Sequence, residues 1–358
     1  MTPTDGSERD CIVTDDVQQR PVSWPRLALH YVGLRFIWSV GSVLIPCQAV
    51  IWLRPLSMWP AVIEQFAVQF SLLAAVALIV ALSMRRWIGA ALFAILLVTL
   101  AWPLVPRGEA AAAPADPARL KIVSANLWYN AADYHRTLDF LMRSDADVIG
   151  LVEVIPAWRE VLAPLIAKYP YKADCADIGP WCETLLLSKL PIVTQRKGIL
   201  APDTPAAAGG DILWGERRIT ILATHFTWPL QPVLERPQGV VHEAAAAPYL
   251  AGPLPNIRQA EQANAFARLA SGLPPDLIVM GDFNSAPWSR VQQSFRAATG
   301  LNNEAGWVLT WPSWLALPLR LPLDHVLSRG HLTVTHFSAG PQTDSDHLPV
   351  IAEIGWRD

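Results

Sequence analysis

Polar side chains of the kinds used in metal-assisted hydrolysis stand next to apolar stretches in the second part of the chain. They are Asn126, Glu153, His225, Asp282, Asn284, Asp324, His325, Asp346 and His347. Carboxylate and amide oxygens suit a hard cation such as Mg²⁺, which keeps several waters and binds substrate phosphate. A histidine held by an aspartate can act as a general base or stabilise a transition state. Zinc fits less well, because the chain has no His-Glu-x-x-His motif and its cysteines lack ligand spacing.

Taken singly, these residues also have structural explanations. Glu153 could end a strand in water, Asn126 could cap a turn, and Asp282 could begin one. His225 and His325 could be hydrogen-bonded core histidines, and for His325 this interpretation is favoured. A structural role is also assigned to four histidines that lie outside the set, His135, His242, His331 and His336. Only the whole set argues for a catalytic site.

The apolar stretches beside these residues predict a layered α/β domain. Strands are expected at residues 120–125, 147–152, 184–188, 218–224, 276–281, 323–327, 332–337 and 348–354. Helices are expected at residues 132–143, 156–168 and 257–269. Strands that form two sheets with helices outside give an α/β sandwich. The polar side chains would then meet at the strand ends, on one surface.

Two motifs, Gly-Asp-Phe-Asn at 281–284 and Ser-Asp-His at 345–347, make the sequence similar to the endonuclease/exonuclease/phosphatase superfamily. Its members include DNase I-like nucleases, abasic-site endonucleases, neutral sphingomyelinases and inositol-polyphosphate 5-phosphatases. The resemblance covers residues 119–358, and the order of the polar residues is kept throughout. Each motif alone is weak, whereas the ordered set is strong. The resemblance implies a DNase I-like four-layer αββα sandwich and a metal-dependent phosphoric-ester hydrolase.

The resemblance also implies a metal-ligand set. Glu153 takes the position of the principal Mg²⁺ ligand, with Asn126 and Asp346 completing the metal side, and Mn²⁺ is an alternative cation. Two positions depart from the superfamily pattern: Val152 stands where glutamine is usual, and His325 where nuclease relatives often have tyrosine. Metal binding should survive both changes. They argue against close kinship with abasic-site nucleases.

The catalytic roles follow from the same resemblance. Asp282 would orient or deprotonate the attacking water, and Asn284 would hold a phosphate oxygen. His225 would contact the phosphoryl group. Asp324 would pair with His347, which would stabilise or protonate the pentacovalent phosphorus. Such a site neutralises developing charge while it places the water for in-line displacement.

Three apolar runs without a charged residue precede this domain, at residues 36–53, 66–84 and 87–105. Each is long enough to cross a bilayer, since a helix needs about 20 apolar residues for that. The sequence therefore predicts a tail at 1–33, three transmembrane helices within 34–105, a Pro/Ala-rich linker at 106–118 and a catalytic domain at 119–358. The alternative is a set of buried helices in a soluble core, which seldom run so long without charge.

Basic residues beside the runs predict the orientation. Six arginines flank one side of the predicted membrane and two flank the other, namely Arg9, Arg20, Arg26, Arg35, Arg85 and Arg86 against Arg54 and Arg107. Positive-inside counting places the N-terminus in the cytoplasm and the catalytic domain outside the cytoplasmic (inner) membrane. Cys175 and Cys182 are close in sequence, and a disulfide between them is favoured over two unrelated thiols in such an oxidising compartment.

The substrate is harder to predict. A membrane tether, an extracytoplasmic domain and a net charge of −3 favour a lipid-linked phosphate or pyrophosphate at the bilayer. The layout resembles membrane-anchored members of the superfamily associated with teicoplanin resistance. The alternatives are an extracytoplasmic nuclease, which the lack of basic surplus disfavours without excluding it, and a catalytically silent binding domain. The Trp- and Leu-rich segment 307–321 either lies on the bilayer or packs under the second sheet, and packing is favoured. No feature indicates a protein partner.

Overall fold

The structure is a computed structural model of the chain, and it describes residues 24–53, 59–105, 118–178, 182–201, 204–229 and 256–357. Residues 1–23 of the predicted tail and 106–117 of the predicted linker lie outside these ranges, as do His242 and the proline-rich residues 230–255. Arg54, one of the arginines used to predict the orientation, also lies outside them.

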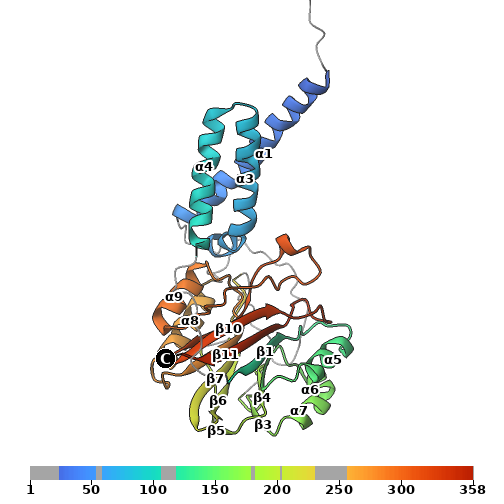
Figure 1. Cartoon of the computed structure of the whole chain (residues 1–358), viewed down its shortest axis with the longest axis vertical. Helices are drawn as coiled ribbons and strands as arrows, with labels where there is room; N and C mark the ends of the chain where they lie inside the picture. Colours follow the sequence, from blue (N-terminus) through green and yellow to red (C-terminus); the bar gives the residue numbers. More distant parts are fainter. Residues whose placement is uncertain are drawn as a thin grey trace, which may run out of the picture.

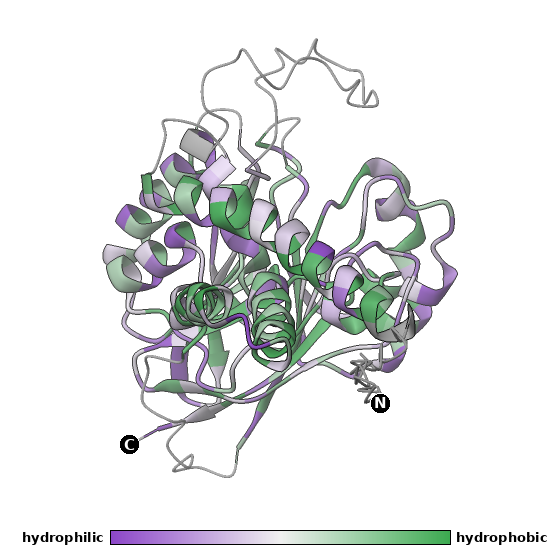
Figure 2. Cartoon of the chain, turned by 90° about the horizontal axis from the view of Figure 1, so that it is seen from above, coloured by the Kyte–Doolittle hydropathy of each residue, from purple (hydrophilic) through white to green (hydrophobic). Residues whose placement is uncertain are grey.

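Three apolar helices long enough to cross a membrane precede the catalytic domain. They are built from α1 (Trp24–Leu53), from α2 (Trp59–Ile63) continued through η1 (Glu64–Phe66) into α3 (Ala67–Ser83), and from α4 (Trp87–Ala101) continued into η2 (Trp102–Leu104). Small side chains of α3 pack against Phe93 and Leu96 of α4. Seen from above, the helices of the bundle are mostly hydrophobic, whereas the helices beside the sheets carry hydrophobic and hydrophilic residues in alternation (Figure 2). An apolar outer surface of this kind suits lipid as solvent.

Two sheets face each other in the catalytic domain. The first has the order β10-β11-β1-β2-β4-β3, with β1 (Leu120–Asn126), β2 (Val148–Val152), β3 (Tyr171–Asp174), β4 (Leu185–Ser188), β10 (Leu332–Ala339) and β11 (Val350–Trp356). The second has the order β5-β6-β7-β8-β9, with β5 (Ile192–Ile199), β6 (Ala206–Trp214), β7 (Arg217–His225), β8 (Leu277–Asp282) and β9 (Asp324–Arg329). Fully buried residues such as Ile122, Ile221 and Met280 fill the space between them.

Helices cover the outer faces of both sheets (Figure 1). The first sheet carries α5 (His135–Arg143), α6 (Pro156–Val161) and α7 (Ala163–Lys168), which bury Leu141, Trp158 and Leu165. The second carries α8 (Asn256–Ser271) and α9 (Arg290–Thr299), whose Phe266 and Phe295 pack on the sheet. This arrangement is the predicted αββα sandwich, preceded by three apolar helices.

Several element boundaries differ from the prediction. Strands β3, β5 and β6 and helix α9 were not predicted. The helix expected at 156–168 is two helices, because the chain breaks at Leu162 and Pro164 starts a new first turn in α7. The first apolar helix begins well before its apolar run, at Trp24, with Pro25 in its first turn.

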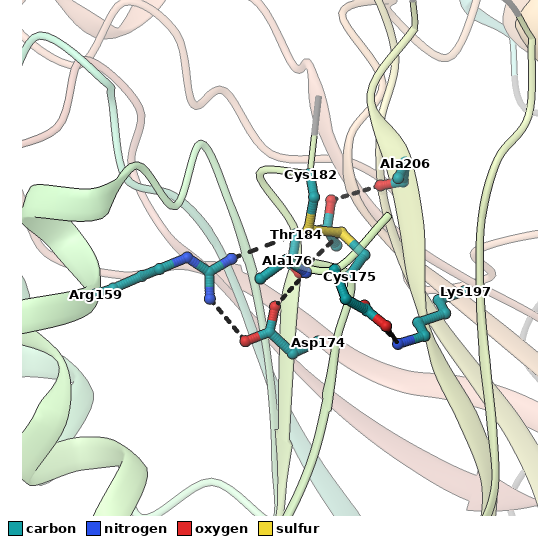
Figure 3. The surroundings of a disulfide bond; sticks show 9 residues. Arg159, Asp174, Cys175, Ala176, Cys182, Thr184, Lys197 and Ala206 are labelled. Carbon is teal, nitrogen blue, oxygen red and sulfur yellow. Dashed lines mark hydrogen bonds and ion pairs between the residues drawn. A yellow bond between two sulfur atoms is a disulfide. The ribbon is translucent and has the colours of Figure 1, made fainter. Parts of the chain in front are cut away.

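Cys175 and Cys182 form a disulfide, as predicted. The bond lies where the end of β3 meets β6 of the other sheet, against Ala206 and Ala208. Arg159 reaches across from α6 and pairs with Asp174 at 2.7 Å (Figure 3). The bridge therefore joins the residue after β3 to a residue shortly before β4 and packs this connection against the second sheet.

Replacing Cys175 and Cys182 together by serine is expected to lower the unfolding temperature of the catalytic domain by about 5–10 °C. Loss of a small closed ring removes about 2.5 kcal/mol of loop-closure entropy, and a domain of this size shifts by about 2–4 °C per kcal/mol. Thermal unfolding of the full-length protein in detergent measures this, with Cys47→Ser as the control, since Cys47 is a free cysteine in α1. A double variant with the unfolding temperature of the parent would contradict the expectation.

Candidate active site

Strand register brings the predicted residues of the second sheet together. At the ends of β7 and β8, His225 is paired with Asp282, and on the other side of β8, Asp282 is paired with Asp324 of β9. In the first sheet, Asn126 is paired with Val152, and Glu153 follows directly. Apolar strands therefore place their terminal polar residues at one end of the sandwich.

The backbone at these strand ends is unusual. Glu153 and Asn284 have φ of 60° and 47°, in the left-handed region that non-glycine residues seldom adopt. Gly281 has a φ of 141°, and a Cβ there would lie 1.8 Å from the carbonyl oxygen of Thr224. Only glycine allows the close approach of β8 to β7 that aims Asp282 into the site. Unfavourable conformations of this kind cluster at functional sites.

Asn126 and Glu153 form one side of the site. The Nδ2 of Asn126 donates to Glu153 Oε1 at 2.8 Å and to Asp282 Oδ2 at 3.1 Å. The backbone N–H of Tyr129 donates to Glu153 Oε2 at 2.8 Å, and that of Trp128 to Asn126 Oδ1 at 2.9 Å. Both side chains are therefore fixed from the loop after β1, and Asn126 links the two sheets.

Asp324 and His347 form a buried pair. The Nδ1 of His347 lies 2.8 Å from Asp324 Oδ2, and its Nε2 lies 3.6 Å from Asp282 Oδ2 and 4.0 Å from Asp346 Oδ1. Burial acts to lower the pKa of His347, but the carboxylates of Asp324 and Asp282 outweigh it and raise that pKa above its usual value. The ring is therefore held in one orientation and favours the imidazolium form.

Asp282, Asn284 and His225 occupy the centre. The backbone N–H of Asn284 donates to Asp282 Oδ1 at 2.7 Å, and its Nδ2 donates to the Phe226 carbonyl at 2.8 Å. His225 Nε2 lies 3.2 Å from Asn284 Nδ2 and 3.7 Å from Asp282 Oδ2. Burial raises the pKa of Asp282 and lowers that of His225. In this dry environment each group favours its neutral form unless a neighbouring charge compensates.

Asp346 completes the group. Its Oδ2 accepts from Trp311 Nε1 at 3.0 Å, whereas its buried Oδ1 has no hydrogen-bond partner among the described residues. Burial raises the pKa of Asp346, although the nearby His347 and the hydrogen bond from Trp311 act in the opposite direction. The structure thus brings all eight predicted residues into one connected cluster.

The cluster suits a cation. Four carboxylates meet there, namely those of Glu153, Asp282, Asp324 and Asp346, and only histidines among the cluster's own side chains can offset them. Ligand atoms of Asp282, Asp324 and His347 lie within 4.8 Å of one another. Glu153, Asn126 and Asp346, the ligand set implied by the resemblance, bring further oxygen-bearing side chains to the same cluster, and such oxygens suit a hard cation. The unpartnered Oδ1 of Asp346 fits the same interpretation.

His325 is a core histidine, as favoured from the sequence. It is buried, its Nε2 lies 2.9 Å from the Ser285 carbonyl, and burial lowers its pKa to about 4. It therefore braces the loop after Asn284 without entering the site. Of the other histidines assigned structural roles, the described ones, His135, His331 and His336, are exposed and lie outside the cluster.

The sequence did not predict three supporting side chains. Trp311 holds Asp346, Gln262 donates to the His225 carbonyl at 2.7 Å, and Gln259 donates to the carbonyls of Phe283 and Asn284. The glutamines lie on α8, one turn apart, on the helix face toward the site. That spacing is the only signal that could have indicated them.

Two facing sheets with carboxylate, amide and imidazole groups at their ends define a metal-dependent phosphoric-ester hydrolase of DNase I-like fold. The sequence model of the endonuclease/exonuclease/phosphatase family matches residues 123–347, which is well over half of the chain. The chain belongs to this family.

Solved structures are similar to this chain, and one of them, with a TM-score above 0.5, supports the fold. An endonuclease/exonuclease/phosphatase from Bacteroides vulgatus is 13% identical, with a TM-score of 0.51 over 67% of this chain and 100% of that one. Sphingomyelinase C from Streptomyces griseocarneus is 18% identical (TM-score 0.46, 66% and 99% covered), and humanized D. rerio TDP2 is 16% identical (TM-score 0.49, 66% and 99% covered). No curated protein sequence matches the chain.

Proposed function

We propose that the protein is a membrane-anchored, Mg²⁺-dependent phosphoesterase that hydrolyses lipid-linked phosphate or pyrophosphate on the extracytoplasmic face. The observation that carries this proposal is the position of the candidate site against the membrane segment. The backbone N–H of Ala286, two residues after Asn284, donates to Gln65 Oε1 at 2.6 Å, and Gln65 lies just before α3. A site next to the membrane helices suits a phosphate group carried by a lipid in that membrane.

An apolar rim beside the site supports the same substrate class. Within the segment 307–321, Trp314, Leu317 and Leu319 are 59%, 62% and 53% exposed, so the interpretation that the whole segment packs under the second sheet is wrong. Only part of it, including Leu321, is buried. Gln69 of α3 donates to the carbonyls of Pro318 and Arg320, which holds the rim at the end of the bundle. Exposed Trp and Leu beside a transmembrane helix suit the headgroup region of a bilayer.

The chemistry follows from the cluster. Glu153, with Asn126 and Asp346, would hold Mg²⁺, which when bound neutralises charge on the phosphoryl oxygens. Asp282 and Asn284 would orient the attacking water and a phosphate oxygen, with His225 beside them. His347, fixed by Asp324, places a positive charge where the transition state becomes more negative.

The compartment is part of the proposal. Arginines concentrate on the side of the apolar helices that carries the N-terminus, which favours an outward catalytic domain. The Cys175–Cys182 disulfide supports this orientation, because such bonds persist in oxidising compartments.

Phosphate release from a polyprenyl pyrophosphate in detergent micelles with Mg²⁺ tests the function. We expect release by the purified full-length protein and loss of that release in His347→Ala, which controls for contaminating phosphatases. Absence of release from a folded, Mg²⁺-loaded sample would overturn the lipid pyrophosphatase proposal. Phosphodiesters, including nucleic acid, would then be tested next.

A further inference from the structure

The membrane segment and the catalytic domain meet through two buried polar residues in an otherwise apolar stretch. Glu64 and Gln65 of η1 are 8% and 2% exposed. The carboxylate of Glu64 accepts from the backbone N–H and Nε of Arg290, both at 3.1 Å, and its carbonyl accepts from Trp288 Nε1 at 2.8 Å. Gln65 donates to the Ala61 carbonyl at 2.8 Å and accepts from Ala286 N at 2.6 Å. This junction lies where the bundle stands on the sandwich (Figure 1).

Two of these partners, Ala286 and Trp288, lie in the loop between β8 and α9, which begins directly after Asp282 and carries Asn284. Side chains hold its backbone at two further points. Gln259 of α8 donates to the Phe283 and Asn284 carbonyls at 3.2 and 3.0 Å, and His325 of β9 lies 2.9 Å from the Ser285 carbonyl. The catalytic domain therefore fixes the start of this loop through the carbonyls of Phe283, Asn284 and Ser285 and through the N–H groups of Phe283 and Asn284. The N–H that follows the Ser285 carbonyl, that of Ala286, is fixed by the membrane segment.

From this arrangement we propose that Gln65 is a positioning residue, through which the docked membrane bundle sets the conformation of the catalytic loop. The inference rests on the proposed assignment of Asp282 and Asn284 as catalytic residues. Ala286 is fully buried, so without the Gln65 oxygen its N–H would lack a partner, which is unfavourable enough to shift the loop. Asn284, at a φ of 47°, lies in a conformation that persists only when its surroundings fix it.

Kinetics of the full-length protein in detergent test the inference. The substrate is bis(p-nitrophenyl) phosphate, a soluble chromogenic phosphodiester, so the assay does not depend on the lipid proposal. We expect Gln65→Leu to lower kcat about 10-fold with KM changed less than 2-fold, because the loop orients reacting groups. Gln65→Glu keeps an acceptor oxygen for Ala286 N and is expected to restore most of kcat, which a general packing role would not predict.

Gln69→Leu is the matched control. It removes two hydrogen bonds between the same membrane segment and the catalytic domain, those to Pro318 and Arg320, but touches nothing in the loop after Asp282. We expect its kcat on the soluble substrate to equal that of the parent. If Gln69→Leu loses as much kcat as Gln65→Leu, the effect belongs to docking in general and the inference is overturned.

Two further outcomes are decisive. If Gln65→Leu retains full kcat while Asn284→Ala is inactive, the inference is overturned and the proposed site stands. If Asp282→Asn and Asn284→Ala both retain activity, the site assignment is wrong and the inference falls with it. Thermal unfolding is measured for each variant to show that it is folded. If Gln65→Leu does not fold, the Gln65→Glu variant decides the question. A kcat of Gln65→Glu as low as that of Asn284→Ala would then count against the inference.

Discussion

Replacing His347 by alanine is expected to lower kcat for phosphoester hydrolysis by about 10³-fold, with little change in KM. The ring is held at 2.8 Å by Asp324 and lies with Nε2 among the carboxylates of Asp282 and Asp346. A fixed, positively charged donor acts mainly on the transition state, where negative charge on the phosphoryl oxygens increases. Loss of such a group therefore reduces kcat and kcat/KM together.

Steady-state kinetics with the soluble diester and with the lipid pyrophosphate measure this effect. His331→Ala is the matched control, because His331 is exposed and contacts Asp276, at the opposite end of β8 from Asp282. A His347→Ala enzyme within 10-fold of the parent on both substrates would show that the His347–Asp324 pair is structural. Asp324→Asn tests whether the orientation of the His347 ring matters. Its kcat should lie between that of the parent and that of His347→Ala.

The layers of the fold could be predicted because their strands carry a strong local signal. Strands such as β1 and β8 are apolar runs rich in Ile, Val and Leu, and their observed ends lie within a residue or two of those expected. Strand β6 begins with three alanines and two glycines, which have low strand propensity. It forms because its small residues allow a close neighbour: a Cβ on Gly209 would lie 2.0 Å from the Ile221 carbonyl oxygen. A contact of that kind leaves no periodicity in the sequence.

The candidate site could be predicted for a similar reason. Its eight residues end or precede apolar strands, and strands of one sandwich bring their ends together. The junction between the apolar helices and the catalytic domain could not be predicted, because Glu64 and Gln65 stand beside an apolar run whose composition indicates only a membrane span. Their partners, Ala286 and Arg290, are more than 200 residues away in sequence. The role of Trp311 could not be predicted either, because only the folded loop brings its indole N–H to the Asp346 carboxylate.

Replacing Glu153 by glutamine is expected to raise the Mg²⁺ concentration for half-maximal activity by about 10²-fold or more. Glutamine keeps the shape of the side chain and an acceptor for Tyr129 N–H, but it removes one of four converging negative charges. Mg²⁺ depends on such charge, since it prefers carboxylate oxygen to neutral ligands and gives up its waters reluctantly. Glutamine keeps one oxygen, which can still accept from Tyr129 N–H, and loses the contact in which Glu153 accepts from Asn126 Nδ2. The variant should stay folded, because only this one hydrogen bond at the strand ends is removed.

Binding can be followed without activity through thermal unfolding. Mg²⁺ at about 100 times its dissociation constant stabilises the native state by about 2.7 kcal/mol, which raises the unfolding temperature of a domain of this size by about 5–10 °C. The parent should show this rise and lose it on addition of a chelator, whereas Glu153→Gln should show almost none at the same Mg²⁺ concentration. Glu160→Gln, an exposed acid on α6, controls for the change of charge and should behave as the parent does. An equal Mg²⁺-induced rise in the parent and in Glu153→Gln would mean that the cation is held elsewhere. The group formed by Asp282, Asp324 and His347 would then be the better candidate for the metal site, because its ligand atoms also converge.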